Sequence, residues 1–85
     1  MFDLEVEAMG LKCPLPVLRL NHRMKELDPG SRVRLICDDV STLTDVPLFC
    51  EARGHVFEGV EEQTNSSPEE DTLYCFSITK GSIQP

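Results

Sequence analysis

The sequence predicts a mixed α/β fold in which a four-stranded sheet packs against helices. Two observations carry this prediction. Segments that alternate polar and apolar residues are typical of half-buried strands, and one segment repeats apolar residues at helical spacing. The predicted order is β-α-β-α-β-β. Because βαβ units give parallel neighbours and the last two strands form a hairpin, we expect a mixed sheet.

The first strand and the first helix have the clearest patterns. Residues 3–8 alternate between polar side chains and the apolar Leu4, Val6 and Ala8, and Gly10 ends the strand. A helix is predicted from Pro14 to about Asp28. Its apolar face consists of Val17, Leu20, Met24 and Leu27. Its polar face consists of Arg19, His22, Arg23 and Glu26.

The remaining elements follow from turn residues and strand-forming residues. Residues 31–37 are strand-like, and residues 41–54 form a second helical region that ends at a glycine. Pro47 is unfavourable inside a helix, so we predict that this helix starts with Asp45 as its N-cap. Two further strands are predicted at 55–60 and 72–80.

Size and composition indicate one globular domain. The chain of 85 residues is predicted to form a single domain over 1–85, with its core at about 4–80, an exposed polar loop at 62–71 and a tail at 81–85. It has no apolar run long enough to cross a membrane, and its start lacks the features of a secretory signal. We therefore expect a cytoplasmic protein, without a membrane partner, that is a monomer.

The charge is unevenly distributed along the chain. The formal net charge of −7 argues against stable direct binding of nucleic acid. Six of the eight basic residues nevertheless lie within residues 12–34, whereas residues 58–71 hold six acids and no base. The basic segment is either a solvated helix face or a docking surface for an acidic protein.

The cysteines differ in their expected roles. Cys37 and Cys75 lie in predicted strands and Cys50 lies among apolar neighbours, so packing is the expected role of all three. Their spacing contains no C-x-x-C and neither histidine lies near one, which argues against a metal site. Cys13, at the predicted start of the first helix, is the candidate catalytic residue.

The position of Cys13 predicts a reactive thiol. If Cys13 is the N-cap, then Pro14, Leu15 and Pro16 are the first helical residues, and the two prolines remove no intrahelical hydrogen bond. The free N–H groups and the neighbouring Lys12 would then lower the thiol pKa. Neither His22 nor His55 can be placed beside the thiol as a base, and position 16 holds no resolving cysteine. Transfer of a sulfur atom as a persulfide requires neither a histidine base nor a resolving cysteine.

Two stretches support this interpretation through a resemblance to a known family. The stretches EAMGLKCPLPVLRL and CDDVSTLTDVPLFCEARGH, within residues 4–80, resemble the TusA (SirA-like) family of small sulfur carriers, which share a Cys-Pro-x-Pro motif after a glycine turn. The resemblance implies a two-layer α/β sandwich (α+β) with both helices on one face of the sheet. It also implies that Cys13 bears the persulfide and that Gly10, Pro14 and Pro16 shape its turn.

The resemblance implies a relay between proteins, with no cofactor other than the transient cysteine persulfide. The donor would be a cysteine desulfurase or a rhodanese-like protein, and an acceptor protein would use the sulfur in tRNA thiolation, cofactor assembly or sulfur oxidation. Two positions depart from the family pattern: Glu7 replaces the usual aspartate, and Leu15 stands where the tRNA-thiolation members often have an acid. We expect partners to dock around four residues, Lys12, Leu15, Arg19 and Arg23.

Several alternatives remain open at the level of sequence. The chain could be a non-catalytic regulatory or RNA-binding module that uses its basic first helix, although it lacks interleaved aromatic residues for base stacking. It could also be a redox sensor in which Cys13 and Cys50 form a reversible disulfide. The acid pair Asp38-Asp39 either caps the following turn or orients a partner.

Overall fold

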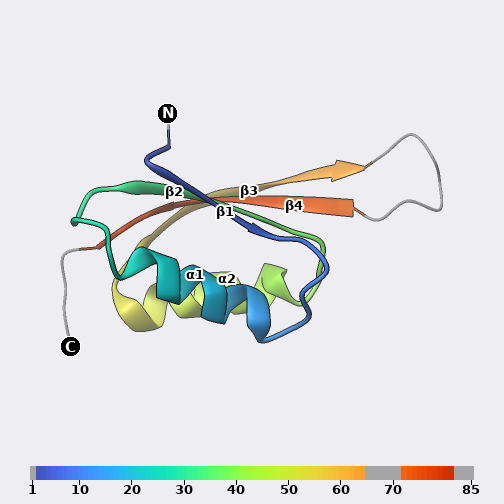
Figure 1. Cartoon of the computed structure of the whole chain (residues 1–85). Helices are drawn as coiled ribbons and strands as arrows, with labels where there is room; N and C mark the ends of the chain where they lie inside the picture. The colour runs from blue at the N-terminus through green and yellow to red at the C-terminus, as the bar shows by residue number, and fades with distance from the viewer. Residues whose placement is uncertain (1, 65–71, 82–85) are drawn as a thin grey trace.

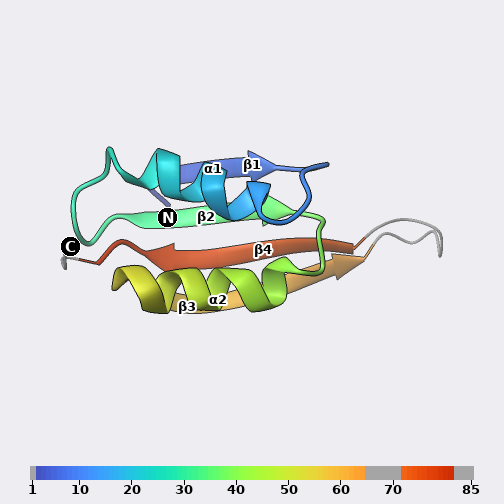
Figure 2. The ribbon, with the colours of Figure 1, turned by 90° about the horizontal axis from the view of Figure 1, so that it is seen from below.

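The fold has two layers, a sheet and a pair of helices. The structure is a computed structural model that describes residues 2–64 and 72–81. The elements in chain order are β1 (Leu4–Ala8), α1 (Leu15–Met24), β2 (Arg32–Cys37), α2 (Thr42–Arg53), β3 (Val56–Thr64) and β4 (Thr72–Thr79). The predicted order is therefore confirmed, and both helices cover the same face of the sheet (Figures 1 and 2).

The sheet is mixed, as predicted. Its strand order is β1-β2-β4-β3. Strands β1 and β2 run parallel, with Leu4 opposite Val33 and Ala8 opposite Cys37, whereas β4 runs antiparallel to both β2 and β3. The parallel pair requires a crossover connection, which α1 supplies, and β1 is left at one edge of the sheet.

The core fills the space between the sheet and the helices. Strands β1, β2 and β4 contribute alternate side chains to this core, because successive side chains of a strand point to opposite faces. The buried apolar side chains include Val6, Ala8, Val33, Leu35, Phe76 and Ile78 from the sheet, and Leu20, Met24, Val46, Phe49 and Cys50 from the helices. The predicted face of α1 is confirmed at Leu20 and Met24, while Val17 and Leu27 are partly buried against the same core.

Helix α1 is shorter than predicted at both ends. It begins at Leu15 with Pro14 as its N-cap residue, so Cys13 lies just before the cap. Cys13 precedes a proline, and such residues are disfavoured in helical conformation. At the other end, the Lys80 Nζ atom donates to the carbonyls of Met24 and Leu27 at 2.6 and 2.8 Å. A cation at this end satisfies carbonyls that lack helical donors.

Helix α2 starts four residues earlier than predicted, with Ser41 rather than Asp45 as its N-cap. Thr42 is its first residue, and Asp45 lies in its first turn rather than at the N-cap. The buried Thr42 hydroxyl donates to the Asp39 carbonyl, and the Ser41 N–H donates to the Asp39 carboxylate at 3.1 Å. These bonds start the helix early enough that Pro47 falls inside it, where proline supplies no N–H to the carbonyl four residues before.

Strand β3 is longer than predicted. It continues to Thr64, so the first residues of the expected 62–71 loop pair with β4 instead. The register shifts between Phe57 and Gly59, which leaves Glu58 as an extra residue in β3. The rest of that loop, 65–71, and tail residues 82–85 lie outside the described residues. Within the described part of the chain, no helix is both long and apolar enough to cross a membrane.

Two leucines of α1 provide a test of the packing. Leu20 is fully buried, whereas Leu18 is 55% exposed on the same helix. Leu20→Ala is expected to lower the free energy of unfolding by about 3 kcal/mol, because it leaves a cavity in a thin core. Leu18→Ala, the matched control, is expected to change it by less than about 0.5 kcal/mol. Urea denaturation measures both values, and equal losses would contradict the assigned face of α1.

Candidate functional site

Cys13 lies in the turn between β1 and α1, and its side chain is exposed. Three backbone and side-chain features shape this turn. Gly10 has a φ of 81°, a conformation that favours glycine. The Met9 N–H donates to the Glu7 carboxylate at 2.9 Å, and the Gly10 N–H donates to the Asp38 carboxylate at 3.1 Å. Glu7 thus supports the turn despite replacing the usual aspartate.

Asp39 holds the backbone of Cys13. The Cys13 N–H donates to Asp39 Oδ2 at 2.6 Å, and the Ser41 N–H donates to the other carboxylate oxygen. These two bonds, aided by the charge of Lys12, hold the pKa of Asp39 below its ordinary value. The acid pair therefore does more than cap a turn, because Asp38 and Asp39 fasten the β1–α1 turn to the segment that follows β2.

Asp45 contacts the thiol itself. The Cys13 Sγ donates to Asp45 Oδ2 at 2.7 Å. This bond, partial desolvation and the negative charges of Asp45 and Asp39 raise the pKa of Cys13 above its ordinary value. The prediction of a lowered thiol pKa is therefore wrong. The thiol lies before the cap of α1 rather than at it, and its bond to Asp45 and the charges of Asp45 and Asp39 favour the protonated form.

The two prolines occupy places where they cost no hydrogen bond. Pro14 is the N-cap residue, and Pro16 is buried at the second helical position. The Cys13–Pro14 peptide bond is cis. The first N–H groups of a helix have no intrahelical acceptor, so proline removes nothing there. The Leu15 N–H donates back to the Lys12 carbonyl at 2.8 Å and closes the turn around the cysteine.

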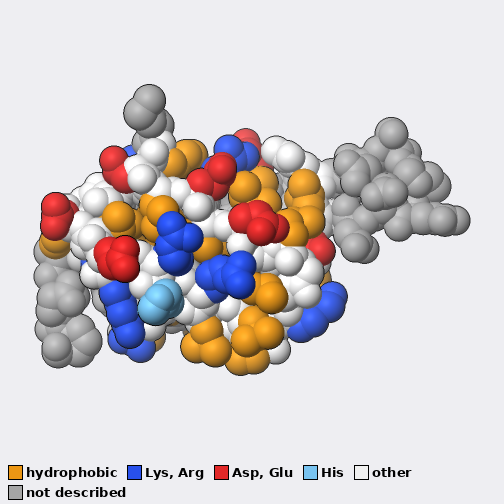
Figure 3. Space-filling model, in the orientation of Figure 1, with side chains coloured by type: hydrophobic (Ala, Val, Ile, Leu, Met, Phe, Trp, Pro, Cys, Tyr) orange, Lys and Arg blue, Asp and Glu red, His pale blue; other side chains and the backbone are white. Residues whose placement is uncertain are grey.

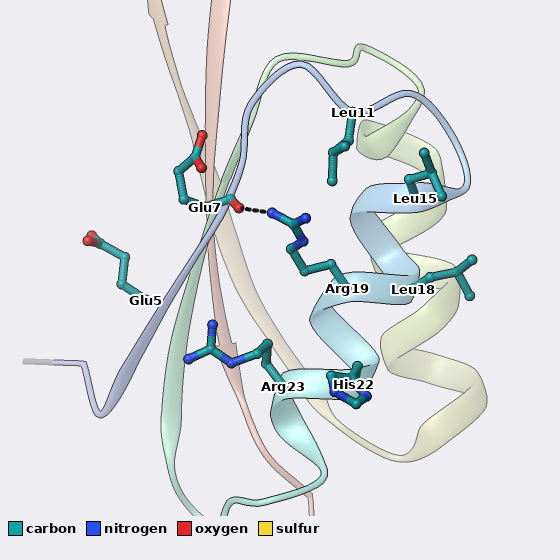
Figure 4. A pocket seen from close by; sticks show the side chains of 8 residues that line it. All are labelled: Glu5, Glu7, Leu11, Leu15, Leu18, Arg19, His22 and Arg23. Atoms are coloured by element: carbon teal, nitrogen blue, oxygen red, sulfur yellow. Dashed lines mark hydrogen bonds between the residues drawn. The ribbon is translucent and has the colours of Figure 1, made fainter.

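The expected docking residues lie beside the thiol and along one groove. Leu15, Arg19 and Arg23 line a groove of about 680 Å³ between α1 and the edge strand β1 (Figure 4). Lys12 precedes Cys13 in the turn. The other lining residues are Glu5, Glu7, Leu11, Leu18 and His22. On this side of the molecule, hydrophobic and basic side chains lie next to each other (Figure 3).

Both histidines lie away from the thiol. His22 lines the groove on α1, nine residues along the chain from Cys13. The His55 ring packs against Phe49 with 5.4 Å between centroids, and its Nδ1 accepts the Gly81 N–H at 3.0 Å. Burial and nearby cations lower the pKa of His55. Among the residues that the structure describes, no three His, Cys, Asp or Glu side chains are arranged to hold a metal ion.

The other three cysteines are buried. The Cys37 thiol donates to the Thr42 hydroxyl at 3.4 Å, and burial raises the pKa of this thiol. Burial also raises the pKa of Cys50 to about 11, so almost none of it is thiolate at neutral pH. A protonated, buried Cys50 is poorly suited to the reversible disulfide that the redox-sensor alternative requires.

Sequence reasoning missed the roles of Asp39 and Asp45 at the thiol. From sequence, Asp39 is predicted to be a cap or a partner contact, and Asp45 an N-cap. The available signal was the D-x-P-x-F-C run that begins at Asp45, because this run supports the same family resemblance as the Cys-Pro-x-Pro motif. Its link to Cys13 is tertiary, across 32 residues of chain.

The fold and the site together define a class of small α/β proteins with one exposed cysteine before the first helix. A crystal structure of a SirA-like protein from Desulfitobacterium hafniense has the same fold, with a TM-score of 0.67 and 21% identity over 93% of this chain and 99% of that one.

The sequence comparisons identify the family. The model of the family described as Sulfurtransferase TusA matches residues 4–80, and the chain belongs to this family. Sulfur carrier protein TusA of Pseudomonas paraeruginosa is 40% identical over 78 residues, which cover 92% of this chain and 90% of that protein. The protein of that name from Pseudomonas syringae pv. syringae is 42% identical over 64 residues, 73% of this chain and 76% of that protein. The family supports a general role in sulfur transfer.

The role of Asp39 can be tested through the pH dependence of stability. Its pKa is lowered in the folded state, so its stabilising contribution is complete above the ordinary aspartate value of about 3.9 and is lost as the pH falls through the lower folded value. Asp39→Asn is expected to lower the free energy of unfolding by about 1 kcal/mol at pH 7. The difference from the wild type should shrink toward pH 3. Urea titrations at both pH values measure this effect, with the exposed Glu26→Gln as control. A loss in the free energy of unfolding that is the same at both pH values would contradict the role assigned to the Asp39 carboxylate.

Proposed function

We propose that this protein is a sulfur carrier that holds sulfur as a persulfide on Cys13 and passes it from a donor protein to an acceptor protein. The observation that carries the proposal is the single exposed thiol, held in a shaped turn by Asp39 and Asp45, in a chain of the TusA family. The other three thiols are buried, so Cys13 is the cysteine that a donor can reach.

The transfer is an exchange between two sulfur atoms. Cys13 Sγ attacks the outer sulfur of the donor persulfide, the donor S–S bond breaks, and the donor leaves as a thiol after taking up the proton of Cys13. The products are the donor thiol and the Cys13 persulfide, so no external oxidant or reductant is needed. Attack by an acceptor thiol on the outer sulfur then restores the Cys13 thiol by the same exchange. The transient persulfide is the only group, other than protein side chains, that this transfer requires.

Partner recognition is proposed to occur at the groove beside the thiol. Leu15 is 48% exposed, and Arg19 and Arg23 add positive charge along the same side of α1. Exposed apolar side chains next to cations suit a protein surface that offers apolar and acidic groups. The donor is proposed to be a cysteine desulfurase or a rhodanese-like protein in the cytoplasm. The sulfur is proposed to serve tRNA thiolation, cofactor assembly or sulfur oxidation.

Intact mass spectrometry tests the carrier function directly. The wild type, incubated with a cysteine desulfurase and cysteine and then freed of reductant, is expected to gain the mass of one sulfur atom. Cys13→Ala is expected to gain none, because its remaining thiols are buried. Treatment with a thiol reductant should remove the added mass. Sulfur on the Cys13→Ala variant, or none on the wild type, would overturn the proposal.

The docking surface can be tested separately from the thiol. Leu15→Ala removes the exposed apolar side chain from the proposed contact and is expected to slow loading from the desulfurase by about tenfold, as for a residue worth more than 1 kcal/mol at an interface. Val56→Ala is the matched control, because Val56 is 52% exposed on β3. Both variants should keep wild-type stability within about 0.5 kcal/mol. Equal loading rates for the two variants would exclude Leu15 from the contact.

A further inference from the structure

We propose that Asp45 is a catalytic residue of the sulfur relay, whose carboxylate accepts the Cys13 proton as the thiol attacks and then delivers that proton to the departing thiolate. This inference rests on the proposed function and adds the residue that moves the proton. It follows first from the geometry of the contact, since Asp45 Oδ2 lies 2.7 Å from Cys13 Sγ and accepts its hydrogen bond.

The position of Asp45 is fixed by the fold. Its N–H donates to the Ser41 carbonyl at 3.0 Å in the first turn of α2. The neighbouring Val46 and the earlier Thr42 are fully buried, which anchors this turn against the sheet. A carboxylate on a rigid helical turn holds its position better than one on a loop. The thiol is held on its own side by the bond from the Cys13 N–H to Asp39.

The other charged groups around the thiol have different tasks. Asp39 accepts two backbone N–H groups, and Asp38 accepts the Gly10 N–H. Lys12, the adjacent residue, is a cation and cannot accept a proton. Among the described residues, Asp45 is therefore the acid whose oxygen is bonded to the sulfur, and neither histidine shares that contact.

The Cys13 thiol requires a proton acceptor before it can attack. The surrounding carboxylates raise the pKa of Cys13, so the resting thiol is protonated at neutral pH. The thiolate is the nucleophile in sulfur exchange, so the proton has to leave during the attack. Asp45 takes it while the new S–S bond forms. Because carboxylic acids are far stronger acids than thiols, the protonated carboxyl group of Asp45 then gives its proton to the departing donor thiolate and becomes a carboxylate again.

Loading kinetics and alkylation kinetics together test this role. The probe is a cysteine desulfurase that carries its own persulfide, mixed in excess with the carrier from pH 6 to pH 10. Asp45→Asn is expected to load about tenfold more slowly at pH 7, where an ordinary thiol is only about 3% thiolate, and to approach the wild-type rate above pH 9. Alkylation by iodoacetamide should instead become faster at pH 7, because the variant thiol ionises more easily and the leaving iodide needs no proton.

The controls separate the proton transfer from other effects of the substitution. Glu51→Gln removes the same charge from an exposed position on α2 and should load like the wild type. Asp45→Glu restores a carboxylate and should recover part of the loading rate, provided that urea denaturation shows both Asp45 variants to be folded.

Each further outcome has a definite meaning. Asp45→Asn loading as fast as the wild type or faster at pH 7 would show that Asp45 merely suppresses the thiolate, and would overturn the inference. Asp45→Glu loading no better than a folded Asp45→Asn would do the same. A wild type that takes up no sulfur would overturn the proposed function, and this inference with it.

Discussion

The candidate site depends on one tertiary link, the attachment of the β1–α1 turn to the segment that follows β2. Asp39 accepts the Cys13 N–H, and Asp45 accepts the thiol. The link is possible because β1 and β2 are parallel neighbours, so their carboxyl ends reach the same edge of the sheet. Without the sheet order, a cysteine and an aspartate that are 32 residues apart could not meet.

The electrostatics of the site differ from those of most reactive cysteines. Such cysteines usually lie near cations or helix N-termini, which favour the thiolate. Here the carboxylates favour the protonated form, while the same thiol is exposed at the surface. A protonated resting thiol is less prone to oxidation, because oxidants react with the thiolate. The thiol is therefore accessible to a partner protein, yet it is protonated and less reactive when no partner is bound.

Sequence predicted the parts of the fold that depend on local periodicity. The buried face of α1, the strand order along the chain and the final hairpin all follow from spacing. The start of α2 does not follow from spacing, because hydrogen bonds from Ser41 and Thr42 to Asp39 outweigh the preference against an internal Pro47. Glu61, Glu62 and Gln63, near the end of β3, are polar and exposed, so this part of the strand has no hydrophobic pattern from which to predict it. Cys13 was evident from its motif, but its carboxylate neighbours required the three-dimensional fold.

Arg19 lines the groove and also contacts the edge strand β1. Its guanidinium donates to the Glu7 carbonyl at 3.0 Å on the outer edge of β1, the strand that ends the sheet on that side. Unpaired strand edges recruit strands from other molecules and start aggregation. By occupying this carbonyl, Arg19 leaves one acceptor fewer on the β1 edge for a strand of another molecule. A side chain that lines the groove thus also covers part of the exposed border of the sheet.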